Sequence, residues 1–274
     1  GPDVNTNEHD MKHFVEAIGN WRGATGKPAN YCMDAFGKKG EKCGIPHEFG
    51  STGFGVAHAA KVALALAGID INKATVAIEG FGNVGSFAFS YLKAMGARIV
   101  AVADRKGTIY DTEGLRGTLL AKIRASGKEV SQYPKGKKLS HEAIFGLPVD
   151  VLIPAAVTDV INEKNMHTVK AKIIVEGANI PMSEKIEREL SRKGILIVPD
   201  FVANAGGVIS SYAEYRGYNP KHMFELVEKK ITATARAVLK KSISEKKFPS
   251  DVAMEIAVNK VKARMRSKTH TFSA

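Results

Sequence analysis

The sequence predicts an α/β fold with a doubly wound, mostly parallel sheet, flanking helices and further helices at the C-terminal end. Short apolar runs alternate with helix-compatible stretches along the chain, and continuous apolar strands separated by helices are typical of parallel sheets buried on both faces. The first of these runs, residues 75–79, ends in a G-x-G-x-x-G loop that precedes a helix-compatible stretch at residues 86–95. A strand, a glycine-rich turn and a helix in this order indicate a Rossmann-like domain.

The glycine-rich loop at residues 80–85 is the strongest functional signal. Gly80 can adopt a turn that side chains forbid, Gly82 lets the backbone approach a diphosphate, and Gly85 lets the helix pack on the strand. The N–H groups at the helix start then face the diphosphate, where the helix dipole favours negative charge. A turn whose glycines serve packing alone is the alternative. We predict that the whole loop binds a dinucleotide: Gly80, Phe81, Gly82, Asn83, Val84 and Gly85.

A second apolar run supports this prediction and bears on the choice of cofactor. Residues 99–103 end in Asp104, nineteen residues after Gly85, where a carboxylate can accept hydrogen bonds from the adenosine ribose. Its charge would repel a 2′-phosphate, whereas Arg105 and Lys106 could bind one. The predicted cofactor is therefore NAD or NADP, with NAD slightly favoured.

Apolar spacing and cap residues place the remaining elements. A helix over residues 6–18 has Thr6 or Asn7 as its cap, and a glycine-rich irregular segment follows as far as residue 50. Another helix runs from residue 51 to residue 67 and ends at Gly68. After the second strand we expect, in order, a helix over 113–126, strands over 150–154, 171–176 and 195–199, and two lysine-rich helices over 220–241 and 250–266.

We interpret residues 1–274 as one dinucleotide-binding domain, because no repeat or flexible linker divides the chain. Within it, residues 1–20 form a hinge-side helix, residues 51–240 the Rossmann-like core and residues 241–274 a C-terminal helix.

Ligands of such sheets bind beyond the carboxyl ends of the strands, so the residues that follow each strand are candidate ligand contacts. They lie in residues 154–156, 176–179, 199–204 and 205–208. Asn179 and Asn204 could orient an amide or a hydroxyl group of a ligand, or they could cap helices.

Composition excludes several classes of function. The 274 residues are 44% hydrophobic and contain no apolar run long enough to cross a membrane, and the polar N-terminal residues are no signal peptide. We expect a cytoplasmic protein. The net charge of +12 comes from lysines and arginines spread along the chain without interleaved aromatic residues, so we expect no nucleic-acid partner.

No metal site is expected. Cys32 and Cys43 lack a second pair or spaced histidines, so we predict free thiols. His47 and Glu48 begin like a zinc-protease motif, but the second histidine is missing.

Several motifs in order give the chain a resemblance over nearly its whole length. It resembles the C-terminal, nucleotide-binding half of glutamate dehydrogenase, a member of the glutamate, leucine, phenylalanine and valine dehydrogenase family. The matching stretches are residues 1–7, 51–55, 80–85, 154–156, 176–179 and 198–208.

The resemblance implies oxidative deamination of L-glutamate to 2-oxoglutarate and ammonia, with hydride transfer to the nicotinamide dinucleotide. Asp3 resembles the catalytic aspartate, which moves protons at the amino nitrogen and the attacking water. Thr52 resembles the residue that holds the nicotinamide carboxamide, and Ser211 the hydroxyl that contacts the side-chain carboxylate of the substrate. The remaining contacts implied for the cofactor are Arg105, Ala155, Ala156, Asn179 and Asn204, and those for the substrate are Asn204, Gly207 and Val208.

The chain also departs from the family pattern. Glu79 occupies the position of a glutamine, and its charge would weaken dinucleotide binding if the side chain faced the site. Asp159 replaces an asparagine, and Ile180 and Met182 alter the Gly-Ala-Asn-Gly-Pro-Thr pattern.

The substrate domain of the family, which carries the lysines that bind glutamate, does not precede Gly1. We therefore expect a dinucleotide-binding domain that lacks turnover by itself, and a hexamer only for a full-length parent. The alternatives are a non-catalytic dinucleotide-binding regulatory paralogue or a dehydrogenase of another amino acid.

Overall fold

The computed structural model describes residues 1–3, 6–32 and 43–269, with side chains as far as residue 266. Residues 4 and 5 of the first matching motif lie outside this part. At its centre is a sheet with the strand order β4-β3-β2-β1-β5-β6-β7. The strands are β1 (Thr75–Glu79), β2 (Arg98–Asp104), β3 (Gly107–Tyr110), β4 (Lys137–Leu139), β5 (Val151–Pro154), β6 (Ile173–Val175) and β7 (Leu196–Val198).

The predicted parallel sheet is confirmed for β2, β1, β5, β6 and β7, which all run in the same direction. The strands β3 and β4 extend the β2 edge in antiparallel order, and sequence analysis missed both. β4 is Lys137-Lys138-Leu139 and largely exposed, so it lacks the apolar run that marks a buried strand. The strand order reverses between β1 and β5, which makes this point the expected ligand crevice.

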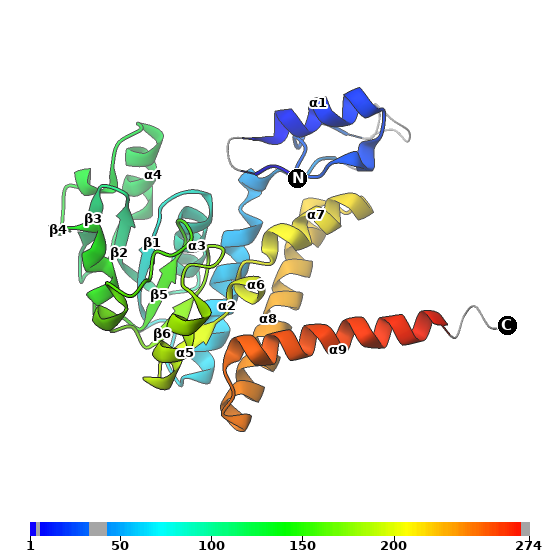
Figure 1. Ribbon diagram of the computed structural model, residues 1–274. Helices are drawn as coiled ribbons and strands as arrows, with labels where there is room; N and C mark the ends of the chain where they lie inside the picture. Colours follow the sequence, from blue (N-terminus) through cyan, green and yellow to red (C-terminus); the bar gives the residue numbers. More distant parts are fainter. Residues whose placement is uncertain (4–5, 33–42, 270–274) are drawn as a thin grey trace.

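Helices cover both faces of the sheet (Figure 1). Val76 and Ile78 of β1 pack on one face with α2 and α3, whereas Ala77 packs on the other face among residues of the loops before β5 and of α5. This alternation follows from the two-residue repeat of a strand. The helices are α1 (Glu8–Ile18), α2 (Ser51–Leu66), α3 (Asn83–Ala94), α4 (Gly117–Ala125), α5 (Glu184–Arg192), α6 (Asp200–Ala203), α7 (Gly206–Arg216), α8 (Pro220–Glu245) and α9 (Pro249–Thr269).

Several helix ends agree with the sequence signals, but α3 begins at Asn83 rather than residue 86, and α8 continues to Glu245 rather than ending at residue 241. Asn7 caps α1, as expected, and forms a capping box with Asp10. The helix expected from residue 113 begins only at Gly117, so that boundary was wrong. Gly114 has φ +93°, and the Glu113 N–H bonds to the Asp111 carboxylate, so a turn precedes the helix. Shorter 3₁₀ helices are η1 (Trp21–Gly23), η3 (His47–Phe49), η4 (Val130–Gln132), η5 (His141–Gly146) and η6 (Met166–Thr168).

The N-terminal segment lies above α7 (Figure 1), and a buried ion pair holds it there. Lys27 Nζ lies 2.5 Å from Glu214 Oε1 of α7, with both residues at most 1% exposed. The Lys27 ammonium also lies 4.1 Å from the ring centroid of Trp21, a cation–π contact. These contacts fix residues 21–27 on the C-terminal part of α7.

The prediction of free thiols is wrong, because Cys32 and Cys43 form a disulfide. Their backbones pair in an antiparallel bridge with Cα atoms 3.9 Å apart. A separation of 11 residues within an irregular segment gives no sign of this proximity.

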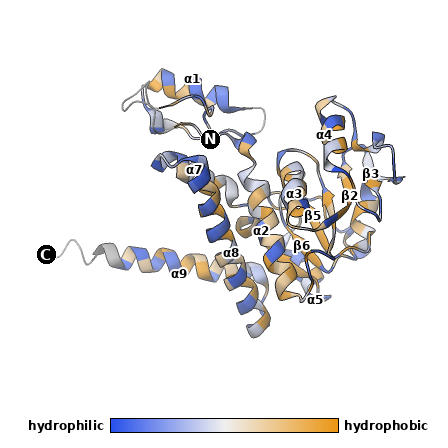
Figure 2. Cartoon of the chain, turned by 180° about the vertical axis from the view of Figure 1, so that it is seen from behind, coloured by the Kyte–Doolittle hydropathy of each residue, from blue (hydrophilic) through white to orange (hydrophobic). Residues whose placement is uncertain are grey.

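The last helix, α9, extends away from the sheet (Figure 1). Figure 2 shows hydrophobic colours over much of the sheet and α2, whereas α9 carries both hydrophilic and hydrophobic residues. Within the described ranges, no helix has the length and apolar character that crossing a membrane requires.

Candidate functional site

The glycine-rich loop has the close packing that its sequence predicts. Gly80 has φ +93°, and a Cβ atom there would lie 2.6 Å from the Ala156 nitrogen. A Cβ atom on Gly85 would lie 1.9 Å from the Gly80 carbonyl oxygen. Side chains are therefore excluded at both positions, which brings the start of α3 against the end of β1.

Gly82 differs from its neighbours in a way that points to a ligand. A Cβ atom on Gly82 would meet no atom within 4 Å, and its φ of −77° suits any residue. Neither packing nor backbone conformation therefore requires glycine here. Gly82 is also the N-cap of α3 and makes no side-chain cap bond, so its open side adjoins the positive end of the helix. A diphosphate fits this place.

The backbone around β5 closes the other wall of the crevice. The Ala155 N–H donates to the Glu79 carbonyl oxygen at 2.7 Å, and the Gly177 N–H donates to the Pro154 carbonyl oxygen at 2.9 Å. Ala155 and Ala156 consequently lie beside Gly80, at the strand-order reversal. Their contact with a dinucleotide stays a prediction.

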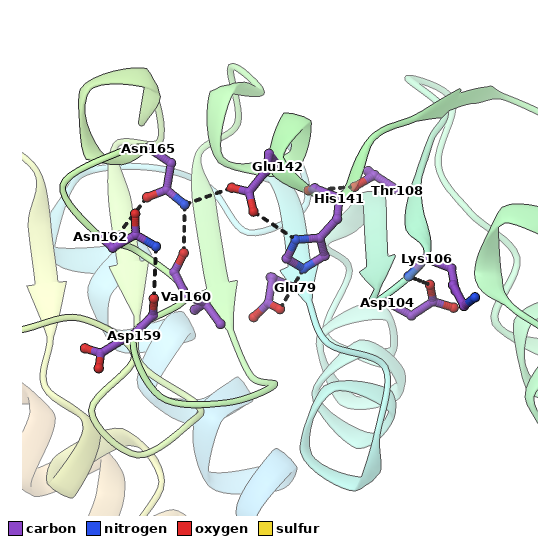
Figure 3. Close-up of polar contacts among 10 residues, drawn as sticks. All are labelled: Glu79, Asp104, Lys106, Thr108, His141, Glu142, Asp159, Val160, Asn162 and Asn165. Carbon is purple, nitrogen blue, oxygen red and sulfur yellow. Dashed lines mark hydrogen bonds and ion pairs between the residues drawn. The ribbon is translucent and has the colours of Figure 1, made fainter.

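Asp104 lies at the end of β2, as expected, but its carboxylate is already bonded. One oxygen accepts the Lys106 N–H at 2.8 Å and the other accepts the Val130 N–H at 2.7 Å; Figure 3 shows the bond to Lys106. Asp104 therefore fixes the β2–β3 turn onto η4. Arg105 is exposed at this turn, and Lys106 Nζ lies 3.8 Å from Glu129.

The two asparagines predicted from the strand ends meet in space. The Asn204 side-chain N–H donates to Asn179 Oδ1 at 2.7 Å. Asn204 ends α6 and comes directly before the α7 region, and Asn179 follows β6. Neither side chain caps the start of the helix that follows it, because the N-cap of α5 is Ser183 and that of α7 is Ala205.

The start of α2 meets the start of α7. A Cβ atom on Gly206 would lie 2.1 Å from the Ser51 carbonyl oxygen, and one on Gly207 would lie 2.9 Å from Thr52 Oγ1. The structure therefore brings together Thr52 and Gly207, which sequence analysis assigned to cofactor and substrate. Val208 beside them is 75% exposed.

The N-terminal residues adjoin α7. A Cβ atom on Gly1 would lie 3.7 Å from Ser211 Oγ, so the chain that carries Asp3 begins beside the predicted substrate hydroxyl. Asp3 is exposed, and its backbone N–H donates to Thr6 Oγ1 at 2.7 Å.

His47 was set aside as part of an incomplete zinc motif, yet it lies near these residues. The Asn83 side chain of the glycine-rich loop donates to the His47 carbonyl oxygen at 3.3 Å. The pKa of the His47 imidazole is lowered from its usual value, chiefly because the ring is buried. The carboxylates of Glu48, Glu214 and Asp3 oppose this effect only in part. The sequence signal that could have placed His47 near this site is its position just before the helix that carries Thr52. No group of histidine, cysteine and carboxylate side chains in the described ranges could hold a metal ion.

The Glu79 side chain does not face the crevice. We expected weaker dinucleotide binding only if it did. Its side chain points to His141 of η5, with Oε1 3.1 Å from His141 Nε2 (Figure 3), and the residue is 1% exposed.

Two of the other departures adopt left-handed backbone conformations. Asp159 has φ +57° and Ile180 has φ +47°, and the Asp159 N–H donates to the Ile180 carbonyl oxygen at 3.0 Å. Aspartate tolerates this region, whereas a β-branched residue in it is strained. Met182 is instead an ordinary core residue, 4% exposed.

The parallel sheet, its strand-order reversal and the open glycine-rich turn are those of a Rossmann-like nucleotide-binding domain. Comparison with known proteins identifies the family. The sequence model for Glutamate/Leucine/Phenylalanine/Valine dehydrogenase matches residues 43–269, and the chain belongs to this family.

Similar proteins include the glutamate dehydrogenase of Aeropyrum pernix, 37% identical over 97% of this chain and 65% of the relative. The NADP-specific glutamate dehydrogenase of Saccharolobus shibatae is 35% identical over 97% of this chain and 64% of that enzyme. Among solved structures, the hetero-hexameric glutamate dehydrogenase of Thermus thermophilus, in its Leu-bound form, superposes with a TM-score of 0.80 and 26% identity, over 97% of this chain and 64% of that chain. The chain thus spans just under two thirds of the length of these relatives.

Proposed function

We propose that this chain is the dinucleotide-binding half of a glutamate dehydrogenase, which converts L-glutamate to 2-oxoglutarate and ammonia. The observation that carries the proposal is the open space beside Gly82, between the start of α3 and the Ala155–Ala156 backbone. The names of the two curated relatives support the activity.

Each group of residues has a role in this proposal. The glycine-rich loop and the start of α3 bind the diphosphate, and Ala155 and Ala156 line the crevice beside it. Thr52, Asn179 and Asn204 orient the nicotinamide end of the cofactor, which accepts the hydride when it is bound. Asn204, Gly207, Val208 and Ser211 contact the substrate, and Asp3 moves protons at the amino nitrogen and the attacking water.

We propose NADP as the preferred dinucleotide, in place of the NAD that the sequence slightly favours. Both oxygens of the Asp104 carboxylate accept backbone N–H bonds, so its charge is partly compensated and its place in the turn is fixed. Arg105 is exposed on the same turn and can bind a 2′-phosphate. The NADP-specific name of the Saccharolobus shibatae relative agrees with this choice.

A titration with NADH and NADPH, followed by nicotinamide fluorescence, tests dinucleotide binding. We expect saturable binding, tighter for NADPH, that Gly82→Val abolishes without lowering the melting temperature, because the added side chain enters open space. Gly85→Ala is the contrasting variant, since its methyl group would collide with the Gly80 carbonyl oxygen and destabilise the fold. A Gly82→Val chain that binds NADPH like the wild type would contradict the proposed site.

A second candidate is a non-catalytic dinucleotide-binding subunit that joins an intact dehydrogenase. The hetero-hexameric assembly named for the Thermus thermophilus structure favours it, because unlike chains share that particle. Purification of the natural protein, followed by its mass and subunit composition, separates this candidate from a homo-hexamer of a full-length enzyme.

We further propose the cytoplasmic location expected from the sequence. The Cys32–Cys43 disulfide makes it testable, because disulfides are uncommon in the cytosol of mesophiles. Thiol labelling of the protein in intact cells distinguishes a reduced pair from an oxidised one. A reduced pair would support the cytoplasmic location, and an oxidised pair would contradict it.

A further inference from the structure

Glu79 is the last residue of β1 and comes directly before the glycine-rich turn. Its backbone carbonyl accepts the Ala155 N–H at 2.7 Å, so its main chain already connects the two walls of the proposed dinucleotide crevice. Its side chain projects to the opposite sheet face from Ile78 and lies against η5. A change in the charge of the Glu79 side chain would therefore affect the place where the two walls of the crevice meet.

The carboxyl group of Glu79 is buried and incompletely bonded. The residue is 1% exposed, and Oε2 is one of the buried side-chain atoms in the described ranges that has no hydrogen-bond partner. Burial raises the pKa of this carboxyl above its usual value, and the neighbouring His141 opposes this effect. A buried carboxylate with one imidazole partner is costly when that partner is neutral. A proton held between the two groups removes this cost.

His141 connects the buried carboxyl to the surface (Figure 3). Its side chain is 25% exposed, and its Nδ1 lies 3.5 Å from Glu142 Oε1. Asn165 donates to the other Glu142 oxygen at 2.9 Å, and Thr108 donates to the His141 carbonyl oxygen at 3.2 Å. The imidazole is therefore held in place and can still exchange protons with water.

The surroundings of Glu79 contain few other charges. From η5 the titratable groups are His141 and Glu142. On β2 the register partner of Glu79 is Ala103, and the following Asp104 carboxylate accepts the backbone N–H groups of Lys106 and Val130. On β5 the partner is Pro154, and in the loop beyond it Asp159 lies on the far side of Val160 (Figure 3). Loss of the shared proton thus leaves one negative charge beneath the turn.

We propose that Glu79 and His141 form a proton-sharing pair that positions the Gly80 turn and the Ala155–Ala156 backbone, so that dinucleotide binding weakens when the pair loses its proton. The inference rests on the proposed function. Glu79 and His141 act here as positioning residues, through the backbone and through the charge below the diphosphate. At a separation of several ångströms, one such charge corresponds to about five-fold in the dissociation constant.

The test measures NADH affinity between pH 6 and pH 8.5. NADH is the probe because it lacks the 2′-phosphate, whose second proton dissociates near pH 6. We expect the wild-type dissociation constant to rise about five-fold over this range. Glu79→Gln removes the ionisable group and keeps a hydrogen-bonding side chain, so its affinity should not change with pH and should exceed that of the wild type at pH 8.5.

Two further variants complete the test. His141→Gln removes the proton partner. Because His141 lowers the pKa of Glu79, the carboxyl alone keeps its proton to higher pH, so this variant should lose less NADH affinity than the wild type between pH 6 and pH 8.5. Glu163→Gln is the control, because Glu163 is an exposed carboxylate paired with Lys185, and it should keep the wild-type profile. If Glu79→Gln and His141→Gln both follow the wild-type pH profile, the pair is overturned and the dinucleotide site stands. If none of the chains binds NADH or NADPH at any pH, the proposed function fails, and the inference fails with it.

Discussion

At the scale of single residues, the glycine-rich turn contains glycines that the fold needs and one glycine that neither packing nor backbone conformation requires. Gly80 and Gly85 are required by a positive φ angle and by a backbone contact, respectively, whereas nothing in the protein fills the space beside Gly82. All three have the same side chain, so the sequence motif marks them alike. The difference is visible only in the surroundings of each Cα atom.

Ile180 shows the reverse case, a side chain in a backbone conformation that disfavours it. Its φ is +47°, and 58% of the residue is exposed. We expect Ile180→Gly to raise the free energy of unfolding by about 1 kcal/mol, because relief of left-handed strain outweighs the small loss of packing. The measurement is urea unfolding followed by circular dichroism.

Ile243→Gly is the matched control for this prediction. Ile243 is also exposed, at 53%, but it lies within the regular helix α8. Glycine there should lower stability by about 1 kcal/mol. Equal losses in the two variants would show that Ile180 carries no strain.

At the scale of elements, a cluster of carboxyl groups joins the end of β6 to α5 and to the start of α9. Glu176 accepts the Asp200 N–H at 2.8 Å, and Ser250 of α9 donates to Glu187 of α5. Burial raises the pKa of Glu176 well above its usual range, with Glu187 and Asp200 adding to the effect. Burial likewise raises the pKa of Glu187, and the Ser250 bond opposes it.

Stability should therefore fall as the pH rises through these displaced pKa values. A carboxyl whose pKa is raised in the folded state stabilises the fold below its unfolded pKa and loses that contribution above its folded pKa. We expect Glu187→Gln to gain stability over the wild type at pH 8.5 compared with pH 4, by on the order of 1 kcal/mol for each pKa unit by which folding displaces the group. Urea unfolding at both pH values measures this difference.

Glu189→Gln serves as the control on the same helix, because Glu189 lies outside the cluster around Glu176. Its effect on stability should be the same at both pH values. A Glu187→Gln effect that does not vary with pH would contradict the assignment of a raised pKa to this group.

At the scale of the whole molecule, the chain contains a mostly parallel sheet with its covering helices and spans just under two thirds of the length of its relatives. We expect the 274-residue chain to bind dinucleotide yet to oxidise glutamate at least about 10³-fold more slowly than a full-length relative, because positioned acid–base groups alone contribute about 10²–10⁴-fold. The measurement is NADPH formation at saturating glutamate and NADP. The Aeropyrum pernix enzyme is the positive control, and steady turnover proportional to chain concentration would contradict the expectation.

The sequence predicted most of the core, because buried parallel strands and their capped helices leave local patterns. The apolar runs at β1, β2, β5, β6 and β7, and the Asn7 cap, are each readable from a few neighbouring residues. The short strands β3 and β4 left no such pattern. β3 pairs with both β2 and β4 but is only 4 residues long, and the edge strand β4 has 3 residues, which are largely exposed.

By itself the sequence determined the fold class, the glycine-rich turn and the family, since these depend on local periodicity and on motifs in order. Tertiary structure alone decided the partners of individual side chains. It turned Glu79 to His141, bonded Asp104 to Val130, joined Cys32 to Cys43 and brought Asn179 to Asn204. Each of these contacts joins residues of different segments, and their distances depend on how the whole chain packs. A local pattern carries no information about that packing.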